Sequence, residues 1–230
     1  MSDKQGRTHW YFQPLRTLYT IAGNRLETRP WGARTVAHIH RWRRIYVNVE
    51  AILLAVLFAL VIRAYIIETY QIPSPSMRPI LREHDRLFVN KFVYRFRLPK
   101  RGEVIVFNVP RNIPNYDPDK PVYIKRVVGL PGDTLEIRNR FLYVNGEKVI
   151  NPPFFARAPY VNRVGIPQGD GSVNLKIFDE EKVPPGQVFV FGDNSPNSYD
   201  SRAWGGVPVG DIKGKAMFRF WPFSRIGFVE

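Results

Sequence analysis

The chain of 230 residues contains no cysteine and only four histidines, and these shortages exclude several kinds of active site. Without cysteine, neither a disulfide framework nor a thiolate metal site can form. His9, His38 and His40 precede the one long apolar run, and His84 sits in a polar turn that is typical of a solvated surface histidine. A Ser-His-Asp triad therefore lacks its base. No histidine pair has the spacing of a zinc hydrolase, so we expect no metal and no cofactor.

Acidic residues are scarce relative to basic ones, which gives a formal net charge of +14. Residues 1–45 hold nine basic residues against two acidic ones, so half of the excess falls in the first fifth of the chain. Such an asymmetry is typical of nucleic-acid-binding proteins or of segments at a membrane surface. Because this segment directly precedes an apolar run, we interpret residues 1–46 as a basic cytoplasmic arm. We expect membrane lipid, and no nucleic acid, as a partner.

The one long apolar run consists of the twelve residues Ala51–Ile62 and resumes after Arg63 as far as Ile67. As a helix, residues 51–67 would span about 25 Å, at the short end of what a bilayer requires. Arg63 lies near the end of the run, where its long side chain can reach the interface. We therefore predict a single transmembrane signal anchor at residues 47–68.

Two alternatives to an anchor are a buried core helix of a soluble protein and a cleaved signal peptide. The basic leader is long for a signal peptide, and no small-x-small cleavage site follows Ile67. Arg41, Arg43 and Arg44 directly precede the run, so the positive-inside rule predicts a cytoplasmic N-terminus. Residues 69–230 would then form an extracytoplasmic domain held at the inner or plasma membrane by one span. The sequence leaves open whether that compartment is a periplasm, the cell exterior or an organelle lumen.

Proline and glycine, with 20 and 17 residues, concentrate after the apolar run and favour short strands over long helices. Segments rich in β-branched and aromatic residues alternate there with turn sequences. These segments are residues 86–94, 102–107, 122–128, 134–138, 141–144, 187–191 and 216–221. Residues 151–180 lack the pattern and are predicted to be an irregular insertion. The fold class is therefore predicted as mainly β, with a coiled, barrel-like sheet behind one N-terminal transmembrane helix.

One lysine and one serine stand out as candidate chemistry. Lys125 sits in the apolar segment 122–128, where strand alternation places it on one face with Tyr123. Such a lysine is either a surface residue whose stem covers apolar neighbours or a desolvated base whose pKa approaches neutrality. Ser76 ends the sequence Pro-Ser-Pro-Ser, which is also typical of a plain turn. A serine hydroxyl is a weak nucleophile without an adjacent base, so neither residue is decisive alone.

Four stretches of the chain together resemble the bacterial type I signal peptidases, the membrane-bound Ser-Lys proteases of family S26. They occur in the family's order and are residues 72–79 (IPSPSMRP), 101–107 (RGEVIVF), 123–133 (YIKRVVGLPGD) and 192–208 (GDNSPNSYDSRAWGGVP). Two positions depart from the family's pattern. Pro75 stands where glycine is usual between the two serines, and Ser195-Pro196 replace an arginine and a polar residue.

The resemblance implies a role for each matching residue. Ser76 would be the nucleophile and Lys125 the general base. Ser74 Oγ, with the backbone N–H of Ser76, would form the oxyanion hole, and Ser198 would orient the amine of Lys125. Residues expected to be structural near the site are Asp193 and the ion pair of Asp200 with Arg202. Residues expected to bind substrate, in shallow pockets that admit small side chains, are Ile72, Pro73, Met77, Leu81, Tyr123 and Ile124.

The resemblance further implies a membrane-bound serine endopeptidase that removes signal peptides from exported preproteins, cleaving after small-x-small residues. Its partners would be preprotein signal peptides, membrane lipid and the secretion machinery. The alternative is a non-catalytic membrane-anchored β-domain that binds peptides or membrane proteins. Two related classes fit less well. Self-cleaving Ser-Lys repressors are cytosolic DNA-binding proteins, and lipoprotein signal peptidases need paired membrane aspartates, which residues 47–68 lack.

Overall fold

The computed structural model describes residues 32–111, 113, 118–119, 121–157, 159–169 and 171–229, and for residues 32–47 and Ala64 it describes the backbone alone. The chain divides into two compact units, residues 1–60 and residues 61–230. Most of the predicted basic arm, residues 1–31, lies outside the described residues. The rest of the arm, residues 32–46, forms the beginning of a helix.

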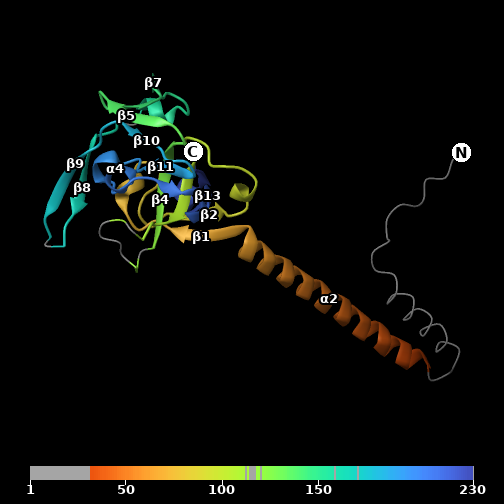
Figure 1. Ribbon diagram of the computed structural model, residues 1–230. Helices are drawn as coiled ribbons and strands as arrows, with labels where there is room; N and C mark the ends of the chain where they lie inside the picture. The colour runs from red at the N-terminus through yellow and green to blue at the C-terminus, as the bar shows by residue number, and fades with distance from the viewer. Residues whose placement is uncertain are drawn as a thin grey trace, which may run out of the picture. The chain divides into compact units, whose positions relative to one another are not determined.

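That helix, α2 (Gly32–Tyr65), covers most of the predicted anchor (Figure 1). Its second half is rich in alanine and leucine, which favour the helix, and large apolar side chains are exposed between Val49 and Ile62. Within the part of the chain that the structure describes, no helix is long and apolar enough to cross a membrane. The helix ends at Tyr65 and a strand begins at Ile67, so the predicted boundary at residue 68 falls inside the sheet.

The second unit is mainly β, as predicted, and all of its described strand pairs are antiparallel. Its strands are β1 (Ile67–Gln71), β2 (Arg86–Asn90), β3 (Val104–Asn108), β4 (Val122–Gly129), β5 (Thr134–Arg138), β6 (Phe141–Val144), β7 (Glu147–Lys148), β8 (Arg163–Pro167), β9 (Val173–Ile177), β10 (Glu181–Lys182), β11 (Gln187–Phe191), β12 (Val207–Pro208), β13 (Ile212–Trp221) and β14 (Gly227–Phe228). Its helical turns are η1 (Pro75–Met77), η2 (Val93–Arg95), α3 (Phe154–Arg157), η3 (Ser195–Asn197), α4 (Ser201–Trp204), η4 (Val209–Asp211) and η5 (Phe223–Arg225).

The largest sheet has the strand order β1-β2-β13-β3-β4-β11-β12, with β14 paired to β13. The long strand β13 shifts register three times against its neighbours β2 and β3, and such bulges bend and coil a sheet. Within the described residues β1 and β12 are the two ends of this sheet, so the barrel-like closure predicted from the sequence is not formed. A second sheet, β10-β5-β6-β7, packs against β4 and β11 of the first through a buried cluster that includes Val128, Leu135 and Phe189 (Figure 1).

The predicted irregular insertion at residues 151–180 contains ordered structure, which corrects that prediction. It holds α3 and a separate hairpin of β8 and β9. Gly165 and Pro167 interrupt the usual run of β-branched residues in β8, which explains why the pattern was not visible in the sequence.

Three buried apolar clusters hold the second unit together. One of them joins the segment after β1 to β2, β3 and β13, and its members are Ile72, Met77, Leu81, Leu87, Val104, Ala216 and Val229. A second packs β3 against β4 and β11 through residues such as Ile105, Val127 and Val190. The candidate site residues adjoin these clusters: Ser76 in η1 precedes Met77 of the first, and Lys125 in β4 follows Ile124, which packs against the first, and precedes Val127 of the second.

Candidate active site

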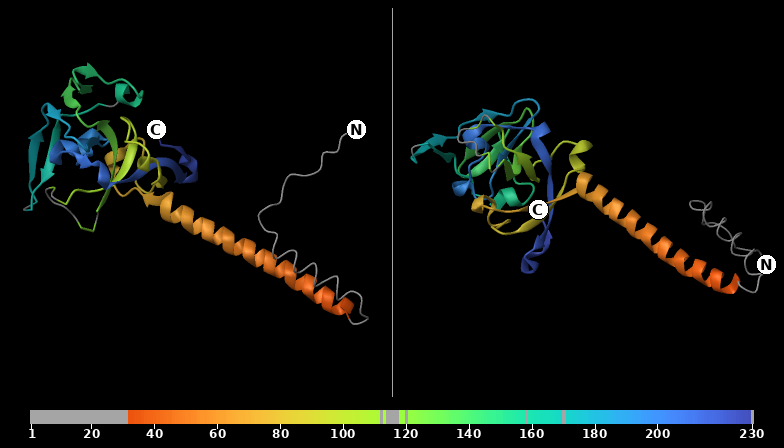
Figure 2. Two further views of the ribbon diagram at one scale, coloured as in Figure 1. Left: turned by 45° about the vertical axis from the view of Figure 1, so that its right-hand side comes forward. Right: turned by 90° about the horizontal axis from the view of Figure 1, so that it is seen from below.

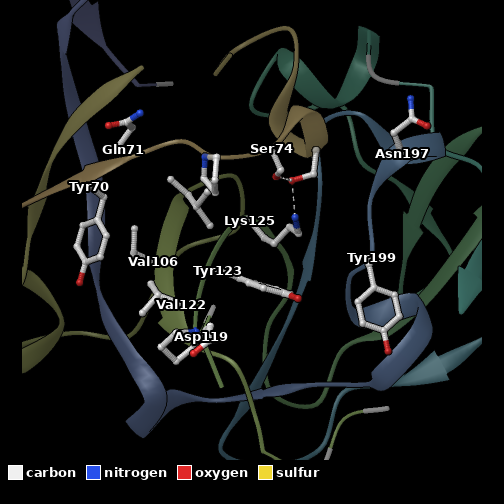
Figure 3. A pocket seen from close by; sticks show the side chains of 14 residues that line it. Tyr70, Gln71, Ser74, Val106, Asp119, Val122, Tyr123, Lys125, Asn197 and Tyr199 are labelled. Atoms are coloured by element: carbon white, nitrogen blue, oxygen red, sulfur yellow. Dashed lines mark hydrogen bonds between the residues drawn. The ribbon is translucent and has the colours of Figure 1, made fainter. Parts of the chain in front are cut away.

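Ser76 and Lys125 are 49 residues apart in the chain and meet in space. Lys125 Nζ donates a hydrogen bond of 2.6 Å to Ser76 Oγ. In Figure 3 the Lys125 side chain points toward the serine turn that carries Ser74. Their exposed fractions are 6% for Ser76 and 5% for Lys125. The contact therefore joins two buried polar groups, which distinguishes it from the plain turn and the surface lysine that the sequence also allowed.

Burial lowers the pKa of Lys125 from 10.5 to about 8. Desolvation is the largest cause, because the ammonium loses its hydration in the interior. The negative charges of Asp200 and Asp193 oppose the shift, and Arg202 adds to it. A lysine with this pKa is neutral in an appreciable fraction of molecules near pH 7.5, and its lone pair can then accept a proton from Ser76.

Pro75 is compatible with the local backbone, although glycine is usual at this position in the family that the sequence resembles. Proline occupies the first turn of η1, where its missing N–H has no helical acceptor and its fixed φ suits the helix. Ser74 precedes this turn, and its Oγ lies 3.2 Å from Ser76 Oγ. Ser74 and Ser76 thus present two hydroxyl groups at one point, beside the N-terminal N–H groups of η1.

Ser198 lies close to the serine turn, and the predicted hydrogen bond from its side chain to Lys125 is not formed in this structure. Its Oγ is buried, and it has no hydrogen-bond partner within the described part of the chain. A Cβ atom added to Gly192 would lie 2.2 Å from Ser198 Oγ and 2.5 Å from the carbonyl oxygen of Ser76. Glycine at position 192 is therefore required for the close approach of β11, Ser198 and the serine turn.

The Gly-Asp-Asn sequence after β11 holds the serine turn in place. The backbone N–H of Asn194 donates to the carbonyl oxygen of Ser76 over 3.0 Å, and Asn194 Nδ2 donates to that of Pro75 over 3.1 Å. Two bonds from one residue fix both carbonyl groups that flank the Ser76 backbone nitrogen. Asn194 is a positioning residue that the sequence analysis did not single out.

Two buried ion pairs support this loop. Asp200 and Arg202 form the predicted pair, with Arg202 Nε and Nη2 each 2.8 Å from the carboxylate oxygens. Asp200 Oδ2 also accepts the backbone N–H of Gly192 over 2.9 Å. Asp193 pairs with Arg126, which donates from Nε over 2.8 Å and from Nη2 over 2.7 Å. Burial raises the pKa of Asp193 in spite of this pair.

Ser195, which with Pro196 is the second departure from the family's sequence pattern, belongs to the same network of buried polar contacts around Arg202. Its Oγ lies 2.7 Å from Arg202 Nη1 and 3.0 Å from the backbone N of Val161. Pro196 falls in the first turn of η3, where a proline is tolerated. Both residues therefore fit the loop, and neither disturbs the contact between Ser76 and Lys125.

A pocket of about 570 Å³ opens beside the two side chains (Figure 3). Its walls come from residues of segments 70–76, 121–125 and 197–199, together with Val106 and Asp119. Three predicted substrate-binding residues line it, namely Pro73, Tyr123 and Ile124. The volume is within the usual range for small ligands and short peptide segments.

The other three predicted substrate-binding residues are core residues in this structure. Ile72, Met77 and Leu81 are 1%, 0% and 0% exposed, and they pack in the cluster that also holds Ile124. They do not line the pocket, whereas Ile124 both packs against that cluster and lines the cavity. The structure replaces them with residues that were not predicted, among them Tyr70, Gln71, Asn197 and Tyr199.

No group of three or more histidine, cysteine, aspartate or glutamate residues among the described side chains could hold a metal ion. His84 is exposed, and its contact is with Gln71 Nε2 at 3.3 Å from His84 Nδ1. Lys125 and Ser76 are placed for proton transfer between a buried amine and a serine hydroxyl at the wall of a peptide-sized pocket.

Comparison with known proteins identifies the family of the chain. Residues 45–221 match the family described as signal peptidase, peptidase S26. A Synechocystis protein named "Probable signal peptidase I-1" is 38% identical over 188 residues, which are 81% of this chain and 87% of that protein. "Signal peptidase I" of Bacillus caldolyticus is 37% identical over 175 residues, 76% of this chain and 90% of that protein.

A crystal structure of a signal peptidase I from Enterococcus faecalis V583 is 29% identical and covers 52% of this chain and 97% of that chain. Its TM-score is 0.36, so it adds nothing to the description of the fold. The match to the family spans more than half of this chain, and the relatives are aligned over most of their own length. The chain therefore belongs to the signal peptidase family, peptidase S26.

Proposed function

We propose that this protein is a serine endopeptidase that removes signal peptides from exported preproteins, with Ser76 as nucleophile and Lys125 as general base. The observation that carries the proposal is the buried 2.6 Å contact between Lys125 Nζ and Ser76 Oγ at the wall of a peptide-sized pocket. The lowered pKa of Lys125, about 8, supports the assignment of the base. Membership of the signal peptidase family supports the choice of substrate.

The proposed reaction begins when neutral Lys125 accepts the proton of Ser76 Oγ. The oxygen then attacks the scissile carbonyl carbon, and the carbonyl oxygen gains the negative charge. Ser74 Oγ and the backbone N–H of Ser76 would donate to that oxygen. The Lys125 ammonium next gives its proton to the leaving amine, which departs with the mature protein. Water activated by the same amine hydrolyses the acyl-enzyme and regenerates Ser76.

The substrate would bind as an extended chain between the end of β1 and the beginning of β4. β11 pairs with β4 only from Arg126 onward, so the pocket adjoins the part of β4 that precedes this pairing. Main-chain pairing of this kind recognises a peptide without regard to most of its side chains. Pro73, Tyr123 and Ile124 line the space beside Ser76, which supports a preference for small residues next to the cleaved bond.

A cleavage experiment tests the function. The full chain, solubilised in detergent, should cut a preprotein at its signal-peptide junction in the presence of EDTA. Ser76→Ala and Lys125→Ala should abolish cleavage. The matched controls Ser224→Ala and Lys182→Ala change exposed residues far along the chain from both and should retain it. No cleavage by the native chain would favour the non-catalytic alternative. Cleavage by Ser76→Ala would show that another group is the nucleophile, and a loss in EDTA that zinc restores would indicate a metal enzyme.

The location of the enzyme is a second part of the proposal. We place residues 47–65 in the membrane as the anchor, the basic arm in the cytoplasm and the β unit outside. The exposed apolar side chains between Val49 and Ile62 and the preceding basic residues support this placement. Protease added to the outside of spheroplasts should digest the β unit and spare residues 1–45. Digestion of the arm with protection of the β unit would refute the orientation.

A further inference from the structure

The hairpin of β8 and β9 stands apart from the other sheets at the margin of the β unit (Figures 1 and 2). Every residue of β9 is exposed. Three of them are large and apolar, and the exposed fractions are 59% for Val173, 65% for Leu175 and 58% for Ile177. Because they alternate along the strand, all three side chains lie on one face of the hairpin.

The backbone N–H and C=O groups of the same three residues point away from β8. The backbone N–H of Gln168 donates to the carbonyl oxygen of Ser172, and that of Phe178 donates to the carbonyl oxygen of Asn162. The residue pairs that flank the hairpin ladder at its two ends are therefore both hydrogen-bonded pairs. Between them the register runs without a shift, and hydrogen-bonded pairs alternate with non-bonded ones. Asn174 and Lys176 therefore bond to β8. The N–H and C=O groups of Val173, Leu175 and Ile177 point to the outer edge, as expected opposite Pro167, which has no N–H.

The opposite face of the hairpin is held against the body of the β unit. Val164 is buried there, and Lys176 Nζ lies 3.4 Å from the carbonyl oxygen of Ala203 in α4. The one charged side chain of β9 is thus turned toward its own chain. Charged residues, prolines and bulges usually protect an edge strand from pairing with another chain, and β9 has none of them on its outer edge.

We propose that β9 is a docking strand for a second copy of this chain. Antiparallel pairing around a two-fold axis at Leu175 would set Leu175 against Leu175 and Val173 against Ile177. Each of these residues would then exchange main-chain hydrogen bonds with its opposite. Lys176 would face Asn174, so no two like charges would be opposed. The self-complementarity of both the edge and the side chains favours a second copy over an unrelated peptide.

The contact is small, since it consists of one five-residue strand and its apolar face. Interfaces of this size are weak in solution. The proposal concerns a surface outside the pocket and does not depend on the roles of Ser76 and Lys125. Variants of β9 should therefore change association between copies and leave cleavage by each copy in place.

Cysteine cross-linking in the native membrane tests the proposal without background, because the chain contains no cysteine. Opposed residues of a hydrogen-bonded antiparallel pair have Cα atoms about 5.5 Å apart, within disulfide range. Leu175→Cys should thus give a cross-linked dimer. Val173→Cys alone and Ile177→Cys alone are matched controls of similar exposure, whose equivalent residues would be about 13 Å apart along the strand. Neither should cross-link alone, but the two co-expressed should.

Introducing charges at Leu175 in both copies tests whether the partner of β9 is a second copy of this chain. With Val173→Cys in one copy and Ile177→Cys in the other, adding Leu175→Lys to both should abolish the cross-link. Leu175→Lys in one copy and Leu175→Glu in the other should restore it. Equal cross-linking of all three single-cysteine chains would show random collision and overturn the proposal. If preprotein, added before oxidation, prevents the Leu175→Cys cross-link, the edge binds substrate and the proposal is overturned. If no dimer forms at all, no second copy pairs with β9, and the proposal is overturned as well.

Discussion

Replacing the buried lysine should make the protein inactive and more stable. Lys125→Met keeps an unbranched side chain of similar length and removes the charge, so it fills the same space without an ammonium group. Desolvation lowers the pKa of Lys125 from 10.5 to about 8, which means that the folded protein disfavours the protonated form. At neutral pH this penalty is present in the native protein and absent in the variant.

The size of the effect follows from the pKa shift. A shift from 10.5 to about 8 corresponds to about 3 kcal/mol between the folded and unfolded chains. The variant also loses the hydrogen bond to Ser76 Oγ, which offsets about 1 kcal/mol. The net gain is about 2 kcal/mol, or a rise in Tm of about 4–8 °C for a unit of this size.

The pH dependence gives the sign of the effect. Below pH 8 both the folded and the unfolded lysine carry the proton, so the native protein bears the full penalty. Between pH 8 and 10.5 the folded lysine releases its proton while the unfolded one keeps it, and native stability rises with pH. Thermal unfolding of the detergent-solubilised full chain should therefore show a higher Tm for Lys125→Met at pH 7 and no advantage at pH 10.5. A variant less stable than the native protein at pH 7, or a difference independent of pH, would refute the reasoning.

Three further substitutions probe the groups around the dyad. Ser74→Ala should lower kcat by roughly 10²–10³, the usual cost of one oxyanion donor, and an unchanged kcat would remove Ser74 from the oxyanion hole. Ser198→Ala should leave Tm unchanged, because Ser198 Oγ has no hydrogen-bond partner in the described structure. We expect it to lower the rate, because Ser198 would orient the Lys125 amine once the substrate is bound, and a full rate would exclude that role. Gly192→Ala should lower both Tm and rate, since its Cβ would lie 2.5 Å from the Ser76 carbonyl oxygen, and native values for both would contradict the close packing described here.

Much of the sheet was predictable because its central strands carry strong local signals. β4 and β11 consist largely of β-branched and aromatic residues, and both are found where the sequence predicts strands. The contact between Ser76 and Lys125 was predictable only from several motifs together, since each residue alone also fits a bland interpretation. The pairing of Asp200 with Arg202 was predictable in the same way.

Other features depend on contacts that no local pattern reveals. The partner of Asp193 is Arg126, 67 residues away, and only the fold brings them together. Ile72, Met77 and Leu81 were predicted to line the pocket, but their apolar side chains are buried more completely in the core beneath it. The helix end at Tyr65 was not visible, because Ile66 and Ile67 continue the apolar run. Pairing of β1 with β2 decides that boundary.

The pH dependence of cleavage tests the central claim most directly, because it reports the protonation of the base while Ser76 is in place. The kcat/KM of the native protein, measured with preprotein well below saturation, should rise with pH and reach half of its maximum near pH 8, where Lys125 of the free protein loses its proton. A rate that is constant between pH 6 and 10, or one that falls as the pH rises through 8, would contradict the assignment of Lys125 as the base that activates Ser76.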